Sequence, residues 1–144
     1  MIEEDTIQLL RECDAGIRMG IASLDEVLPF VSGREFKRLL EECRREHDVL
    51  ASELQQRLAR FGDSGKQPNP VAKTMSGLMT DVKLTLNDSD STAASVLTDG
   101  CNMGVKSLNR YLNQYEAAEE YAKDITKRLI HLEQKLTEDM RDYL

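Results

Sequence analysis

Apolar residues recur at steps of three and four along most of this chain, the spacing that places side chains on one face of an α-helix. The first stripe predicts a helix that begins near Glu3 or Asp5. Its members are Leu10, Cys13, Ile17, Gly20, Leu24, Val27 and Val31. The second stripe consists of Phe36, Leu40, Cys43, His47, Leu50, Leu54 and Leu58. Ser32 followed by Glu35 predicts a turn with a capping box between the two helices. Gly62 is expected to end the second helix in the left-handed conformation.

A loop at residues 62–70 separates this pair from the rest of the chain. A shorter stripe predicts a helix at residues 70–86, and residues 87–91 break it and cap the next helix. That helix carries Ala94, Leu97, Cys101, Gly104, Leu108, Tyr111 and Tyr115. The last helix carries Ala122, Ile125, Leu129, Leu132, Leu136, Met140 and Tyr143. No segment alternates with the period of a strand, so the chain is predicted to be all-α.

Two of these helices carry the same motif. Residues 19–24 read Met-Gly-Ile-Ala-Ser-Leu and residues 103–108 read Met-Gly-Val-Lys-Ser-Leu, an offset of 84 residues (103 minus 19). The same offset aligns Gly16 with Gly100. The repeat predicts one helical hairpin used twice, and two such hairpins joined by a long connection form a ferritin-like four-helix bundle.

The predicted architecture is therefore a single domain over residues 1–144. It consists of a hairpin at 3–61, a crossover with a short extra helix at 62–90, and a second hairpin at 91–144. A chain of this length can bury a hydrophobic core without disulfides or metals.

Gly20 and Gly104 lie within apolar stripes, where leucine would be expected. Missing side chains at equivalent places predict that helix backbones approach closely there. Accidental tolerance of a small residue is the alternative. A further possibility is a cavity beside the two glycines that holds a small ligand. Its lining would be Cys13, Ile17, Leu50 and Cys101.

Composition and charge narrow the classes of function. The chain has 144 residues, of which 40% are hydrophobic and 31% charged, as in globular helical domains. The net charge of −7 disfavours nucleic acids and anionic membranes as partners, because these require a concentrated basic face. Three cysteines without a paired motif favour a reducing cytoplasm. We expect neither a signal peptide nor a transmembrane span.

A dinuclear metal centre in such a bundle needs four carboxylates and two histidines that point inward. His47 lies on its stripe, but the residue three positions before it is Arg44, which cannot bind a cation. His131 lies about 135° from the centre of its stripe and is expected at the surface. The positions expected for single glutamates hold Ile17 and Cys101, or Cys13 and Leu97 one turn earlier, and none of these is a carboxylate.

We therefore expect no bound metal and no other cofactor, and the remaining weak candidates for metal ligands are His47, Glu133 and Asp14. In the preferred register, Glu133 corresponds to Arg44 and Leu136 corresponds to His47. We hypothesise that Arg44 replaces the cation and pairs with Glu133, or with Asp14, because a guanidinium can bridge carboxylates. The alternative is that Arg44 extends to solvent.

No other chemistry is assigned to named residues. The chain lacks a glycine-rich phosphate loop, and neither histidine belongs to a recognisable nucleophile motif. The cysteines are interpreted as small core residues rather than reactive thiols. No catalytic residue is therefore predicted.

The chain resembles the ferritin-like superfamily, especially small bacterial members of unknown function that are distantly related to rubrerythrins. The residues that carry this resemblance are the repeated Met-Gly-x-x-Ser-Leu motif, the segments 42–54 and 75–90, and the closing segment 133–144. The resemblance implies a bundle, dimers and a bacterial cytoplasm. It also implies metal-dependent redox chemistry, from which this chain departs at Ile17, Arg44, Cys101 and Leu136.

Three hypotheses of function follow. The first is a non-enzymatic bundle with a structural or protein-association role, as a homodimer or with another protein partner, and with exposed apolar surface on the crossover helix or the C-terminus. The second is a degenerate metalloprotein that retains Fe, Mn or Zn near His47 and Glu133. The third is a small-ligand carrier that uses the core beside the glycines.

Overall fold

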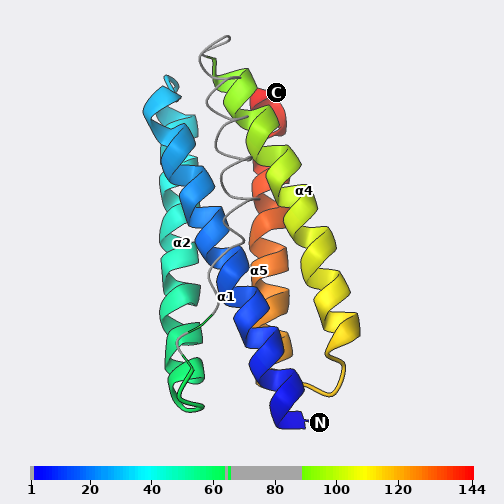
Figure 1. Ribbon diagram of the computed structural model, residues 1–144. Helices are drawn as coiled ribbons and strands as arrows, with labels where there is room; N and C mark the ends of the chain where they lie inside the picture. The colour runs from blue at the N-terminus through cyan, green and yellow to red at the C-terminus, as the bar shows by residue number, and fades with distance from the viewer. Residues whose placement is uncertain (1, 64, 66–88) are drawn as a thin grey trace.

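The computed structural model describes residues 2–63, 65 and 89–144. Its long helices are α1 (Ile2–Val27), α2 (Arg34–Ala59), α4 (Asp90–Gln114) and α5 (Glu120–Asp139). Short 3₁₀ turns, η1 (Leu28–Phe30) and η2 (Arg141–Tyr143), follow α1 and α5. The prediction of an all-α chain is confirmed for the described residues, which contain four long helices and no strand (Figure 1). The predicted short helix at residues 70–86 lies outside the described residues.

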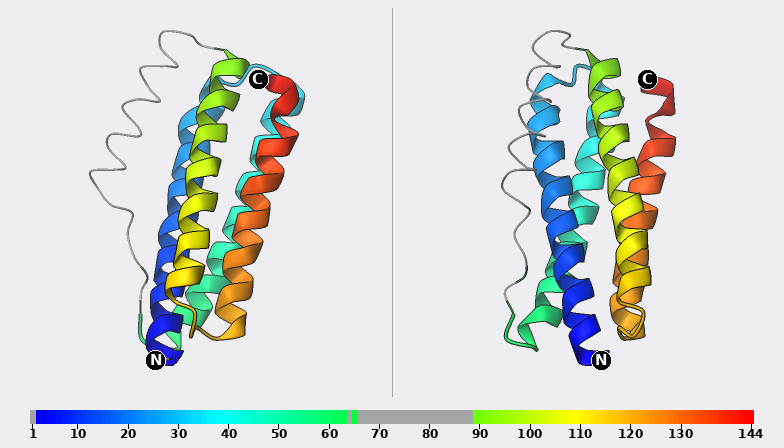
Figure 2. Two further views of the ribbon diagram at one scale, coloured as in Figure 1. Left: turned by 90° about the vertical axis from the view of Figure 1, so that its right-hand side faces the viewer. Right: turned by 45° about the vertical axis from the view of Figure 1, so that its right-hand side comes forward.

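The four helices form a bundle of two antiparallel hairpins, α1 with α2 and α4 with α5. In Figure 1, α1 runs upward and α2 downward, α4 again runs downward, and α5 returns upward. The end of α2 and the start of α4 therefore lie at opposite ends of the bundle (Figure 2). Helix α1 packs against both α2 and α4, and α5 packs against both as well, so α2 and α4 occupy opposite corners.

The turn of the first hairpin differs from the prediction. Gly33, rather than Ser32, is the N-cap of α2, and its helix start has no side-chain cap. The backbone N–H groups of Ser32 and Gly33 instead donate to the two carboxylate oxygens of Asp90, each at 2.8 Å. The predicted capping box was therefore wrong, because Asp90 of α4 satisfies the backbone donors and ties the hairpin turn to the second half of the chain.

Two other predicted helix ends agree with the structure. Ser89 caps α4 by accepting a hydrogen bond from the Thr92 N–H at 3.1 Å. Gly62 has a φ of 69°, the left-handed conformation expected after the end of α2.

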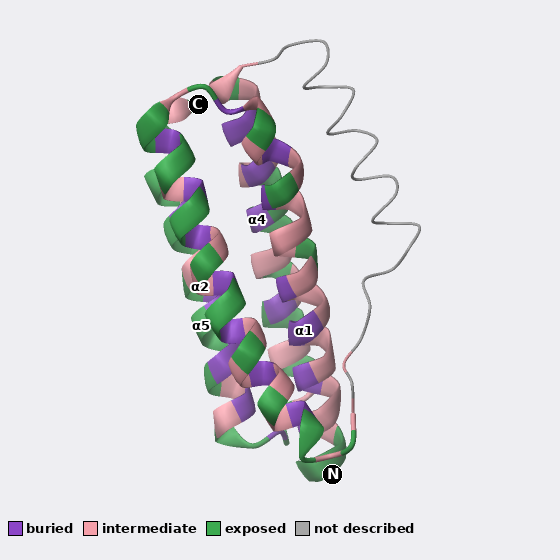
Figure 3. Ribbon diagram, turned by 90° about the vertical axis from the view of Figure 1, so that its left-hand side faces the viewer, coloured by how far each residue is buried: buried purple, intermediate pink, exposed green. Residues whose placement is uncertain are grey.

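The core consists of two hydrophobic clusters stacked along the bundle axis, formed by the buried sides of the helices (Figure 3). One cluster includes Leu9, Leu10, Cys13, Ile17, Leu50, Leu54, Leu58, Leu108, Ile125 and Leu129. The other includes Leu24, Val27, Phe36, Leu40, Cys43, Ala94, Leu97, Cys101, Leu136 and Met140. The stacked rings of Phe36 and Tyr143, 4.4 Å apart at their centroids, cover the end of the second cluster.

The burial pattern repeats between the hairpins with two different offsets. In α1 the buried positions Leu9, Leu10, Cys13, Ile17 and Leu24 recur 84 residues later as Ala93, Ala94, Leu97, Cys101 and Leu108. In α2 the buried positions Phe36, Leu40, Cys43, His47 and Leu50 recur 86 residues later (133 minus 47) as Ala122, Thr126, Leu129, Glu133 and Leu136. Glu133 is thus equivalent to His47, and the register that paired it with Arg44 was wrong.

Candidate functional site

Four residues lie at the boundary between the two hydrophobic clusters, one on each helix. They are Gly20, His47, Gly104 and Glu133, and we call them the central polar layer. Along each helix, the residue of the layer lies between the residues that belong to one cluster and those that belong to the other. The layer is therefore one level of the bundle, although its members are far apart in sequence.

In the first hairpin, His47 of α2 fills the space beside Gly20 of α1. The His47 side chain is 2% exposed, and a Cβ atom on Gly20 would lie 2.8 Å from its Nε2 and 3.1 Å from its Cδ2. Real Cβ contacts are not that short, so residue 20 must lack a side chain for the imidazole to occupy this place.

The second hairpin repeats this arrangement with a carboxyl group. Glu133 of α5 is 7% exposed, and a Cβ atom on Gly104 would lie 3.0 Å from its Cδ and 3.1 Å from its Oε1. Both motif glycines therefore make room for a buried polar side chain from the partner helix. The predicted ligand cavity beside the glycines was wrong, because His47 and Glu133 occupy that volume.

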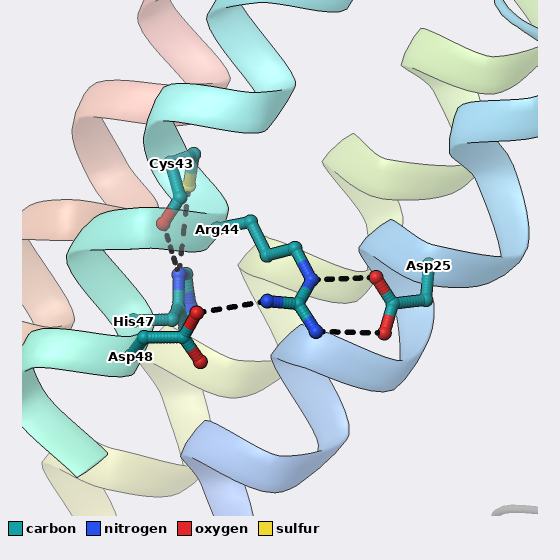
Figure 4. A network of polar contacts seen from close by, with 5 residues as sticks. All are labelled: Asp25, Cys43, Arg44, His47 and Asp48. Carbon is teal, nitrogen blue, oxygen red and sulfur yellow. Dashed lines mark hydrogen bonds and ion pairs between the residues drawn. The ribbon is translucent and has the colours of Figure 1, made fainter. Parts of the chain in front are cut away.

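The hydrogen bonds of His47 determine which ring nitrogen carries a proton. Its Nδ1 lies 2.8 Å from the carbonyl oxygen of Cys43 and 3.6 Å from the Cys43 sulfur (Figure 4). A carbonyl oxygen can only accept, so Nδ1–H is the donor and Nε2 of the neutral ring is an acceptor. Burial lowers the pKa of His47 and keeps the ring neutral. Nε2 is buried and has no hydrogen-bond partner among the described residues.

Glu133 is the complementary case. Its Oε2 is also buried without a hydrogen-bond partner among the described residues. Burial alone raises the pKa of the Glu133 carboxyl to about 8, because the charged form would lose its hydration. At neutral pH Glu133 is therefore mainly the protonated acid, which has an O–H donor.

The three free cysteines belong to the two hydrophobic clusters, Cys13 to the first and Cys43 and Cys101 to the second, and they are not activated. All are buried, and desolvation raises the pKa of Cys13 to about 12, that of Cys43 to about 12, and that of Cys101 further. Thiols with such pKa values are almost entirely protonated at neutral pH and are poor nucleophiles. This agrees with their interpretation as core residues.

Arg44 lies at the edge of the first hairpin rather than at its centre. Its guanidinium donates to both carboxylate oxygens of Asp25, at 2.6 and 3.2 Å, and to Asp48 at 2.8 Å (Figure 4). The hypothesis that it pairs with Glu133 or Asp14 named the wrong carboxylates. Its position on α2, three residues before the inward-facing His47, directs it toward the flank of α1 instead. The side chain is 35% exposed, so it also reaches solvent as the alternative predicted.

Asp14 is buried and is held by other groups. Its carboxylate pairs with Arg18 Nε at 3.0 Å and accepts from Gln55 Nε2 at 2.8 Å. Within the part of the chain that the structure describes, no group of three or more His, Cys, Asp and Glu side chains is placed to hold a metal ion. The side chains of the central polar layer therefore do not fit the dinuclear ligand set that the resemblance implies. His131 is exposed, as its position off the stripe predicted.

Comparison with known proteins gives no match to a family model, a curated protein or a solved structure. Among the helices described here, none combines the length and apolar composition required to cross a bilayer. What the protein does must therefore be inferred from its own packing and surface.

The sequence analysis correctly predicted that His47 and both motif glycines lie on inward faces of their helices. It did not show that the glycines face His47 and Glu133.

Proposed function

We propose that this protein is a non-enzymatic helical bundle that acts by protein association, and that its partner is a second copy of the same chain, bound through the outer face of α4. One observation carries the proposal. Met103 is 72% exposed, the highest value of any large hydrophobic residue among those described. Singly exposed apolar residues are common on protein surfaces, so the surroundings of Met103 decide its meaning.

Met103 belongs to a stripe along α4. Val96 is half-buried and Gly100 is exposed, and steps of four and three place both on the same side of the helix as Met103. A Cβ atom on Gly100 would meet no atom within 4 Å. The backbone at Gly100 is thus open to a partner helix, and Met103 is a flexible side chain that can pack against it.

Charged residues on either side of Met103 favour a second copy as the partner. Asp99 and Lys106 are both exposed and lie four residues before and three after Met103. In an antiparallel pairing of two α4 helices about a two-fold axis near Met103, Asp99 of one copy faces Lys106 of the other, and the same contact occurs twice. Such complementarity fixes register and orientation.

Other features support the finer parts of the proposal. One long crossover between two antiparallel hairpins is the connectivity of ferritin-like bundles. Three buried free cysteines suit a reducing compartment, which supports a cytoplasmic location. The C-terminus, where apolar surface was expected, has Leu144 at 59% exposure, whereas the crossover lies outside the described residues.

Size-exclusion chromatography with light scattering tests the proposal. We expect the wild-type protein at about twice its monomer mass of 16.3 kDa, and Met103→Glu at the monomer mass. Val49 is 68% exposed on α2, at the opposite corner of the bundle, so Val49→Glu is a matched control that should remain dimeric. A monomeric wild-type protein at all concentrations would contradict the proposal, as would equal disruption by both variants.

The charge pair gives a second, independent test. We expect Asp99→Lys and Lys106→Asp each to weaken the dimer, because each brings like charges together across the axis. The double variant Asp99→Lys with Lys106→Asp restores the pairing and should recover the dimer. A double variant that dimerises no better than the single variants would rule out the proposed antiparallel register.

A further inference from the structure

Two buried polar atoms of the central polar layer have no role in the association proposed above. They are Nε2 of His47 and Oε2 of Glu133, each in a side chain that is more than nine-tenths buried. Leaving a buried donor or acceptor unpaired destabilises the fold, because the atom loses its hydration and gains no partner in return. Two such atoms at the same level of one bundle call for a common explanation.

Packing contacts show that the two atoms share this level. A Cβ atom on Gly16 of α1 would lie 3.8 Å from Leu108 of α4. Because α1 and α4 are antiparallel, four residues further along α1 corresponds to four residues back along α4, which brings Gly20 opposite Gly104. His47 lies against Gly20 and Glu133 lies against Gly104, so both side chains reach the same part of the core.

Their hydrogen-bonding characters are complementary. The bond from Nδ1 to the Cys43 carbonyl leaves Nε2 of His47 as an acceptor. A protonated carboxyl group has the O–H donor that this acceptor lacks. We infer that His47 and Glu133 form one buried acid–imidazole unit, in which one water molecule bridges Nε2 of His47 and Oε2 of Glu133, and that the unit binds a single titratable proton.

Among the described residues, no charged group contributes to the raised pKa of Glu133, which comes from burial alone. Glu133 in turn raises the pKa of the thiols of Cys13, Cys43 and Cys101, one on each of the other three helices. On His47, Glu46 and Asp48 act from its own helix, and its neighbour on α1 is Gly20, which has no side chain. The shared proton is therefore what keeps this level of the core neutral.

A consequence is that the bundle responds to mildly alkaline pH at its centre. Loss of the proton leaves a carboxylate beside Gly104, surrounded by two apolar clusters. The bridging water molecule loses its O–H donor at the same time. Both hairpins are affected by one deprotonation, since one partner belongs to each hairpin.

NMR titration of the full-length protein with labelled histidine and glutamate tests the inference. We expect the chemical shifts of the Glu133 carboxyl carbon and of His47 Nε2 to change together, in a single titration step above pH 7. In Glu133→Gln, whose amide N–H can still donate to the bridging water molecule, the His47 step should be lost while the fold is retained. His131→Gln changes the exposed histidine and should leave the step unchanged.

Two results would overturn the inference. One is a Glu133 carboxyl that titrates in the ordinary range for glutamate. The other is a His47 resonance that does not follow the Glu133 step in the wild-type protein. The experiment is independent of the oligomeric state, so failure of the proposed dimer and failure of the acid–imidazole unit are distinguishable.

Discussion

The first hairpin places an imidazole beside its motif glycine, whereas the second places a carboxyl group at the equivalent position. Burial acts on both, but in opposite directions: it lowers the pKa of His47 and raises that of Glu133. One group stays neutral by giving up a proton and the other by keeping one. The two halves of a repeated architecture thus arrive at an uncharged core by different chemistry.

The comparison also shows what the repeat preserves. The glycine is present in both halves, and so is the position that faces it, but the identity of the facing side chain differs. Steric room for a buried polar side chain is therefore the shared property, and the acid or base character of that side chain is the variable one. Changes to the glycines and to the polar side chains should separate these two properties.

The largest expected effect is on the pH dependence of stability. The folded pKa of Glu133, about 8, lies above its unfolded value near 4.5, so folding stability is lost as pH rises between these values. His47 has a lowered folded pKa, so its contribution has the opposite sign and ends near its unfolded pKa of 6.5. Only the Glu133 slope remains above that pH.

We therefore expect the free energy of unfolding to fall by roughly 2 kcal/mol between about pH 6.5 and 8, at about 1.4 kcal/mol per pH unit. Urea denaturation at a series of pH values measures this fall. Glu133→Gln should remove it and leave the rise below pH 6.5 that belongs to His47. A wild-type slope that persists unchanged in Glu133→Gln would assign the pH dependence to other groups.

The second largest effect is expected for Gly20→Ala. The new Cβ would lie 2.8 Å from Nε2 of a ring that its bond to the Cys43 carbonyl holds in place. Overpacking of this kind costs about 1–3 kcal/mol, more than the helix propensity gained by replacing glycine. Thermal or urea unfolding should show a less stable protein.

Gly16→Ala is the matched control for that substitution. Gly16 lies on the same helix, and its Cβ would be 3.6 Å from Leu129 and 3.8 Å from Leu108, which is ordinary van der Waals contact, so alanine should stabilise the protein by about 1 kcal/mol. If Gly20→Ala were as stabilising as Gly16→Ala, the close contact between His47 and residue 20 would be wrong.

Gly104→Ala sharpens the contrast between the hairpins. Its Cβ would also contact a buried side chain, but the nearest atoms belong to the carboxyl group at the end of flexible Glu133. A long side chain can move its end group at less cost than a hydrogen-bonded ring. We expect a smaller loss than for Gly20→Ala, of about 1 kcal/mol or less, in the same unfolding experiment. A larger loss at residue 104 than at residue 20 would reverse this ranking.

The sequence was sufficient to predict the helices because each has an amphipathic stripe of its own. It also showed the repeat, since Met-Gly-x-x-Ser-Leu survives in both α1 and α4. The second pair of helices has no such motif, and its offset of 86 became visible only from which residues are buried. The expected register had an offset of 89 (133 minus 44), and a shift of three residues is hard to detect in a stripe whose members recur at steps of three and four.

The role of the central polar layer was harder to predict for a physical reason. Periodicity shows which face of a helix a residue occupies, but not which residue of another helix it meets. Glu133 reads as a residue at the flank of its stripe until Gly104 is placed beside it. Arg44 was assigned the wrong carboxylates for the same reason, because its partner Asp25 lies 19 residues away on a different helix.

The smallest effects are expected for the arginines that tie helices together at the surface. Arg44 links α2 to Asp25 of α1 within the first hairpin, whereas Arg128 of α5 links to Glu53 of α2, across the two hairpins, at 2.8 Å. Both side chains are partly exposed, at 35% and 43%, so solvent and salt screen these ion pairs. We expect Arg44→Ala and Arg128→Ala each to cost less stability than Gly20→Ala, and the loss to shrink at high salt. Urea unfolding at low and high salt, with Arg45→Ala as an exposed control on α2, measures both. If the loss of stability is the same at high salt, these arginines stabilise the fold through packing of their aliphatic stems and not through their ion pairs.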